Sequence, residues 1–279
     1  MGRFIAVLLF VALLVPAVFV GRAWSRAALR RAVSNGTLSL TLPTTEAERA
    51  MKLQAQRARL WRLAGVAVAL VASVAALVVL AERAVFLWPG LLVMGFLGGI
   101  LLGELARVRP AWGTGSHRRR PQSELIDLPL PSIGRLAAVG LVVTAALAGS
   151  QTWEQEFLIA AGVGVVAWLI VEITLERLAR RILPSGSEDV PVDDALRINS
   201  AHVAVGAGSI LVLVVLAGLL FVSGVRIGDS GSGADLAPVA LIAGAFGALV
   251  GALVIGVFLV RWLAPVRWAE AAWWTSRRG

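Results

Sequence analysis

The chain of 279 residues contains no cysteine and no tyrosine, and Lys52 is its single lysine. Without cysteine, disulfide bonds, thiolate nucleophiles and thiolate metal sites are excluded. Its two histidines, His117 and His202, are too few for a histidine-rich metal box. Charge is scarce as well, because charged residues make up 15% of the chain, whereas a soluble domain usually has about 25%.

In place of charge, the sequence has apolar runs of membrane-spanning length. Hydrophobic residues make up 58% of the chain, and a spanning helix needs about 20 mostly apolar residues. Seven runs are candidate spans: 4–20, 63–81, 85–103, 136–153, 157–175, 203–225 and 236–260. The fourth, which ends in polar residues, and the fifth, which contains Glu172, are the weakest. The sequence therefore predicts an all-α membrane protein with seven transmembrane helices.

Basic residues fall on alternate sides of these predicted spans. Residues 21–62, 104–135, 176–202 and 261–279 carry 23 basic residues, and the remaining termini and connections carry 3. Basic residues resist translocation across the membrane, so the basic segments should be cytoplasmic. This predicts a multi-pass protein of the cell membrane with its N-terminus outside and its C-terminus inside. The basic charge of these segments then faces the anionic inner leaflet, and no nucleic-acid partner is expected.

The first predicted span should remain in the membrane as an anchor helix. Its positive flank follows the apolar run, at Arg22 and Arg26, whereas the positive flank of a signal peptide precedes it. Short outer connections then pair the other six spans into three helical hairpins. The predicted organisation is an anchor helix at 1–21, a basic cytoplasmic segment with a helix at 22–62, and a six-helix transmembrane domain at 63–279. That domain includes cytoplasmic loops at 104–135 and 176–202 and a basic, Trp-rich cytoplasmic tail.

Three local patterns refine this organisation. Thr45 and Glu48 have the spacing of a capping box, which predicts a helix that continues into the second span. Before it, residues 37–43 alternate like a short strand. Small residues also recur every four positions in the third and seventh spans, where they permit close helix packing within one chain or between two copies. These residues are Gly95, Gly99 and Gly103, and Ala243, Gly247 and Gly251.

The stretch VPVDDALRINSAHV, before the sixth span, is dense in polar residues. Pro191 suits the first turn of a helix, and Asp193 and Asp194 lie where the helix dipole favours negative charge. Asp193 and Arg197 are i, i+4 neighbours on such a helix, whereas His202 points nearly the opposite way. A helix start thus accounts for the acids and Arg197 and leaves His202 unexplained.

Two glutamates are candidate functional residues. Glu104 ends the third span, and Glu172 lies in the inner third of the fifth. An ionisable group within the hydrocarbon is costly and is by default a functional hypothesis. The competing interpretation is a layer of ion pairs with the arginines that enter at the same level. Because Glu176 is expected to turn to Arg180, Glu172 is the best single candidate for a functional role.

No phosphate-binding loop, nucleophile–base pair or metal-ligand set is found in the sequence, so no catalytic residue and no cofactor is predicted. The leading hypothesis is a non-enzymatic scaffold or accessory subunit. It would bind protein partners through its long cytoplasmic segments or form a homo-oligomer. The alternative is a small transporter or permease-like subunit with Glu172 in the pathway.

Two sequence features carry a resemblance. The third span leaves the membrane through Glu104-Leu-Ala-Arg-x-Arg-Pro, and Asp193-Asp-Ala-Leu-Arg197 with Ser200 and His202 precedes the sixth. With these features and its predicted topology, the chain resembles uncharacterised multi-pass integral membrane proteins of actinobacteria, over most of its length after the first span. The resemblance implies a location in the membrane and implies no particular activity.

Overall fold

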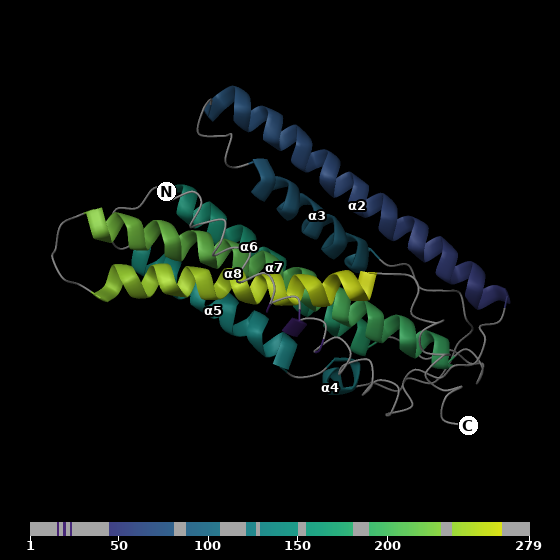
Figure 1. Ribbon diagram of the computed structural model, residues 1–279. Coiled ribbons are helices and arrows are strands. Elements are labelled where there is room, and N and C mark those ends of the chain that lie inside the picture. The colour runs from purple at the N-terminus through teal and green to yellow at the C-terminus, as the bar shows by residue number, and fades with distance from the viewer. Residues whose placement is uncertain are drawn as a thin grey trace. The chain divides into compact units, whose positions relative to one another are not determined.

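The computed structural model describes most of the predicted transmembrane region. The described residues are 45–80, 88–106, 121–126, 129–149, 155–180, 190–229 and 236–263, together with Pro16, Phe19, Val20 and Ala23. Regular structure in these residues is entirely helical (Figure 1). The predicted first span, apart from the isolated positions named, lies outside the described residues, as do the strand-like residues 37–43 and the tail.

Six long helices and one short helical turn follow one another along the described chain. They are α2 (Thr45–Leu80), α3 (Trp88–Leu105), α4 (Gln122–Leu125), α5 (Pro129–Gly149), α6 (Gln155–Ala179), α7 (Val190–Asp229) and α8 (Leu236–Leu263). Each predicted span from the second to the seventh falls on one long helix, in order. Five of these helices contain a stretch long and apolar enough to cross a membrane, and α3 contains a shorter one, Gly90–Leu105. The prediction of an all-α membrane protein is thereby confirmed.

Several helix boundaries differ from those that hydropathy predicts. The fourth span is helical from Pro129 rather than from residue 136, because proline is accepted in the first turn of a helix. The fourth and fifth spans both reach membrane-spanning length, and the third is the short one. The helix α2 begins at Thr45 and runs through the second span, as the capping-box spacing predicts.

The chain divides into two compact units. Unit 1 comprises Met1–Leu29, Asp127–Leu169 and Gly208–Leu263, and unit 2 comprises Arg30–Ile126, Ile170–Ala207 and Ala264–Gly279. By these bounds α5 and α8 belong to unit 1, and α2, α3 and α4 belong to unit 2. The long helices α6 and α7 each contribute residues to both units.

In unit 1, α7 and α8 form an antiparallel hairpin. A Cβ placed at Gly224, near the end of α7, would lie 3.0 Å from the carbonyl oxygen of Pro238, near the start of α8. Further along the pair, Leu213 Cδ1 lies 3.6 Å from the Cβ position of Gly251. In the same unit a Cβ at Gly134 of α5 would overlap the Trp168 ring of α6. The predicted pairing of consecutive spans is therefore observed.

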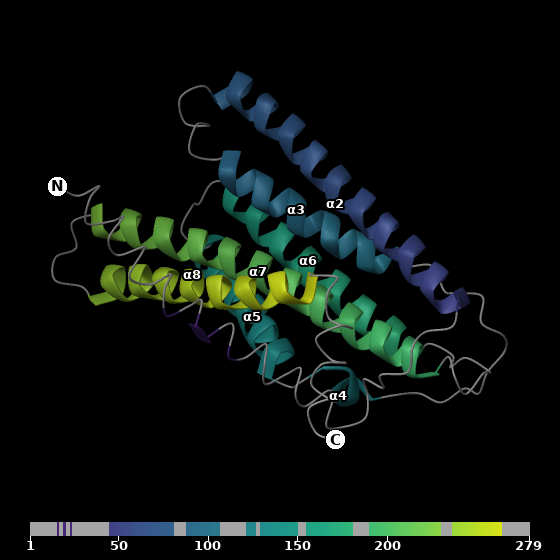
Figure 2. The ribbon, with the colours of Figure 1, turned by 45° about the vertical axis from the view of Figure 1, so that its right-hand side comes forward.

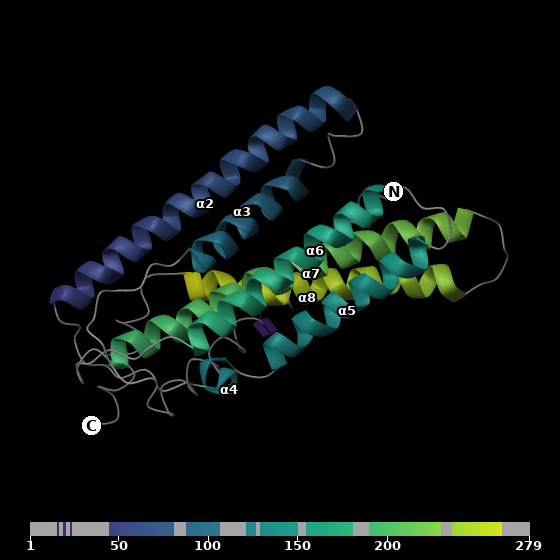
Figure 3. The same cartoon turned by 180° about the vertical axis from the view of Figure 1, so that it is seen from behind.

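In unit 2, α2 and α3 approach each other backbone to backbone. A Cβ added at Gly99 would lie 2.5 Å from the Trp61 carbonyl oxygen and 3.2 Å from Gly65 Cα, and a Cβ at Gly103 would lie 3.1 Å from Trp61 Cβ. Gly95 meets Gly65 in the same way. The two helices lie side by side in both Figure 2 and Figure 3. The small residues of the third span thus pack within the chain, which is one of the two uses expected for them.

The small residues of the seventh span are used differently. In α8, Ala243 and Gly247 are exposed, and no described heavy atom lies within 4 Å of the Cβ position of Gly247. Gly251 of this series meets a neighbouring helix, through Leu213. Their use between two copies stays a prediction.

The outer surfaces of the helices expose large apolar side chains. Val71 of α2 is 71% exposed, Leu136 of α5 is 72% exposed and Leu236 of α8 is 82% exposed. By contrast, 67% of the apolar stretch Leu196–Gly228 of α7 is buried, against 11% of Gln56–Ala75 of α2. Apolar faces of this extent mark surfaces that contact lipid or protein. The chain is an integral membrane protein.

Candidate functional site

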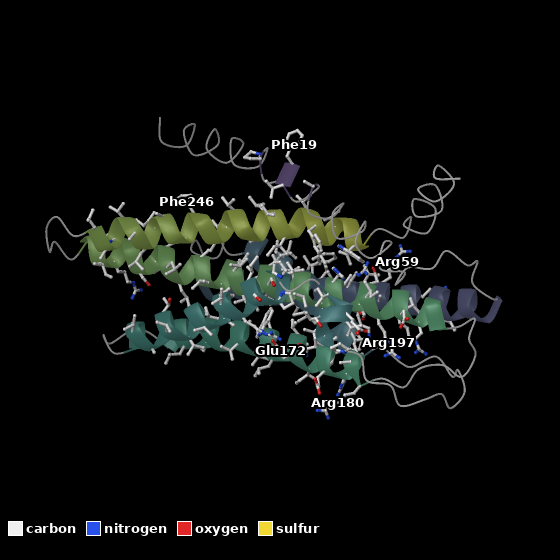
Figure 4. The ribbon with its side chains drawn as sticks, turned by 90° about the horizontal axis from the view of Figure 1, so that it is seen from below. Phe19, Arg59, Glu172, Arg180, Arg197 and Phe246 are labelled. Atoms are coloured by element: carbon white, nitrogen blue, oxygen red, sulfur yellow. The ribbon has the colours of Figure 1, made fainter. Side chains whose placement is uncertain are left out.

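Unit 2 gathers polar side chains where α3 and α6 end and where α7 begins. We call Glu104, Arg177, Asp193, Arg197 and Ser200 the helix-end cluster. Four of these side chains are buried, and Arg177 is exposed. Figure 4 labels Arg197 on α7 and Arg180, the residue that follows α6. Because buried polar groups are costly unless hydrogen-bonded, the partners of each determine what the cluster does.

Arg197 is the centre of this cluster. Its side chain is 0% exposed, and its Nε donates to Asp193 Oδ2 at 2.6 Å, one helical turn earlier. Its Nη1 donates to the carbonyl oxygen of Leu178 at 3.3 Å. Leu178 lies in the last turn of α6, where carbonyl groups have no donor within their own helix and a nearby cation is favoured. Arg197 of α7 therefore caps the end of α6.

Two further contacts join α3 to the other helices of the cluster. The Ser200 hydroxyl donates to Glu104 Oε2, which links α7 to the end of α3. Arg177 Nη1 donates to the carbonyl oxygen of Leu105 at 3.3 Å, which links α6 to the last residue of α3. With the Arg197–Leu178 bond, each pair among α3, α6 and α7 has its own polar link.

His202 and Asp194 border the cluster on α7. His202 is buried, and its Nδ1 lies 2.7 Å from the carbonyl oxygen of Ile198, so Nδ1 carries the proton that this carbonyl accepts. The sequence left His202 unexplained, and the structure shows that it bonds to its own helix. Asp194 is buried beside Asp193 near the start of α7, where the helix dipole favours a carboxylate.

Glu172 lies on α6, before Arg177 in the sequence. It is half-buried within the apolar stretch Leu158–Ala179, and it has an interaction partner within the protein. One turn further, Glu176 forms an ion pair with Arg180 at the exposed end of the helix, as the i, i+4 spacing predicts. The structure thus brings Glu104 into the cluster. Glu172, labelled in Figure 4, is half-buried in a predicted span.

The sequence predicted only part of this arrangement. The helix start at Val190 with Asp193 in its first turn is confirmed, and so is the pairing of Asp193 with Arg197. The contact between Ser200 and Glu104 was missed, because 96 residues separate the two in sequence. The only available signal was that both lie at a predicted inner boundary.

The chemistry available to this cluster is hydrogen bonding between helix ends. In the residues that the structure describes, no group of three or more histidine or carboxylate side chains could hold a metal ion. No protein-family model, curated protein or solved structure matches the chain.

Proposed function

We propose that the chain is a non-enzymatic integral protein of the cell membrane that acts as a scaffold or accessory subunit. The observation that carries this proposal is how the candidate polar residues are used. Arg197, Ser200 and His202 donate to Leu178, Glu104 and Ile198 inside the fold. These hydrogen bonds stabilise helix ends and the interior of a helix. The cluster therefore supports a structural role better than a catalytic one.

The basic, cytoplasmic segments are the surface through which such a subunit would bind its partners. The 23-to-3 partition of basic residues supports an inner location for the connections that follow α3 and α6. The link between α7 and α8, residues 230–235, is short by comparison and offers little surface. Connections between rigid helices are where proteins commonly carry recognition. The anionic inner leaflet is the second partner that this charge fits.

Purification in a mild detergent tests the proposal. A tagged chain should recover a protein partner or a homo-oligomer in a fixed ratio. A variant with residues 107–120 and 181–189 replaced by Gly/Ser segments of equal length should lose it. The matched control, with residues 230–235 replaced in the same way, should keep it. A wild-type chain that is strictly monomeric and free of any partner contradicts the proposal.

A small transporter is the second candidate function, and Glu172 is the observation that favours it. A half-buried carboxylate within a predicted span is the type of residue that ion and proton pathways use. If the chain is a transporter, E172Q abolishes ion or proton flux into proteoliposomes while the variant remains folded. If the scaffold function holds, E172Q recovers the same partner or oligomer as the wild-type chain.

A further inference from the structure

We infer that the three polar links between the ends of α3, α6 and α7 act together as a latch. The latch couples the cytoplasmic connections to the α2–α3 hairpin. It consists of the contacts Arg197–Leu178, Ser200–Glu104 and Arg177–Leu105. The inference rests on the proposed function in one respect, namely that a partner bound to those connections acts on the latch.

The links form a closed ring, which is stronger than three separate bonds. α7 is joined to α6 through Leu178, α6 to α3 through Leu105, and α7 to α3 through Glu104. When one link breaks, the two helices that it joined remain connected through the third helix. Partial opening is therefore opposed, and the ring favours two states, closed and released, of the type on which switching depends.

The ring lies where the connections leave the helices. Leu105 is the last residue of α3 and Leu178 is the last but one of α6, so each arginine holds a carbonyl beside the start of a connection. Arg197 and Ser200 lie in the first three turns of α7. Arg177 also lies in the last turn of α6, so a force on the connection between α6 and α7 acts on a residue of each of the three links.

The backbone contact between α2 and α3 carries this motion further. Gly103, the residue before Glu104, packs against the Trp61 side chain, and Gly99 packs against the Trp61 carbonyl at one turn's distance. A tightly packed interface transmits displacement instead of absorbing it. When the end of α3 is released, α2 must move with it.

The buried charge sets which link controls the others. Arg197 and Asp193 are both excluded from solvent, and separating a buried pair is strongly unfavourable. Arg177 is exposed, so water replaces its carbonyl partner at low cost. Arg197 therefore holds the ring in its closed state, and the Ser200–Glu104 bond connects the position of α7 to that of α3.

Hydrogen exchange of the full chain in lipid nanodiscs, with no partner present, tests the latch. R197K keeps the charge and loses the planar fork that reaches both Asp193 and Leu178. We expect exchange at the C-terminal turn of α3 to rise about tenfold in R197K and in S200A, since each loses roughly one hydrogen bond to a charged or capping group. E176Q, which removes an exposed ion pair on α6, is the control and should leave exchange at α3 unchanged.

The double variant shows whether the coupling passes through Ser200. In S200A, adding R197K should give no further rise at α3, although the start of α7 should still exchange faster. An unchanged α3 in R197K overturns the latch, as does an equal further rise in the S200A background. A uniform rise that includes α8 also overturns it, because that result reports loss of stability throughout the protein. Loss of a co-purified partner does not bear on these outcomes, so the latch and the proposed function fail separately.

Discussion

Arg197 and Leu178 are held together by a hydrogen bond from Nη1 of the arginine to the carbonyl oxygen of the leucine, at 3.3 Å. The two residues are 19 positions apart, and the connection between α6 and α7 lies between them. An arginine without solvent contact thus closes the loop that leads into α7. Its removal is the most direct perturbation of this end of the protein.

We expect R197M to lower the free energy of unfolding by about 3–5 kcal/mol, because it breaks the buried ion pair between Arg197 Nε and Asp193 Oδ2. R180Q is the control. Its exposed pair with Glu176 should contribute no more than about 1 kcal/mol. Unfolding in mixed detergent micelles, followed by the fluorescence of the 10 tryptophans, measures both variants.

The double variant D193L/R197M should be more stable than R197M alone, because it replaces both members of the buried pair and so does not bury one charge after removing the other. The same unfolding experiment measures this rescue. Equal stability of the single and double variants would show that capping of Leu178, and not the ion pair, is the larger contribution of Arg197.

Ser200 and Ser209 are both fully buried on α7, and we expect opposite results when each is replaced by alanine. Ser200 donates to a carboxylate, so S200A should cost about 1.5–3 kcal/mol. Ser209 Oγ has no hydrogen-bond partner among the described residues, so S209A should be neutral or stabilising. The unfolding midpoints of S200A and S209A, measured under identical conditions, test this difference. A large loss of stability in S209A would contradict a buried Ser209 hydroxyl without a hydrogen-bond partner among the described residues.

Gly99 and Gly98 are neighbours in α3 that differ in what surrounds them. G99A places a methyl group 2.5 Å from the Trp61 carbonyl oxygen and should destabilise the α2–α3 hairpin by about 1–3 kcal/mol. G98A meets nothing within 4 Å and should be neutral or stabilise by up to about 1 kcal/mol, since alanine is the better helix former. Thermal unfolding in detergent measures both. Equal effects would contradict the backbone contact.

Reporter fusions test the predicted orientation. A reporter active only in the cytoplasm should be active after Gly279 and silent after Gln155, because Gln155 begins α6 at the end away from the basic residues. Activity at both positions would leave five spans, and silence after Gly279 would reverse the orientation.

Features set by periodicity could be predicted from the sequence, and features set by tertiary contact could not. The pairs Asp193–Arg197 and Glu176–Arg180 follow from the helical repeat alone. The helix start near residue 190 was likewise predicted, from Pro191 and the two aspartates, and it is the first turn of the 40-residue helix α7. The contacts of Arg197 with Leu178 and of Ser200 with Glu104 were not predicted, because α6 and α3 supply those partners.

The same distinction explains the outcome at the glycines. Spacing of four marks Gly99 of α3 and Gly247 of α8 equally, yet Gly99 meets Trp61 and Gly247 meets no described neighbour. The sequence fixes which helix faces allow close approach, and a face becomes an interface only when a second helix is placed against it.

The separation of Glu104 and Ser200 by 96 residues also imposes an order on biogenesis. A chain made at 5–20 residues per second reaches Ser200 about 5–20 s after Glu104. The glycine contact between α2 and α3 needs only those two helices, so it can form in the bilayer during this interval. A newly synthesised molecule can therefore have its α2–α3 hairpin packed before Glu104 has made its contact with Ser200. Insertion of α7 then supplies that contact.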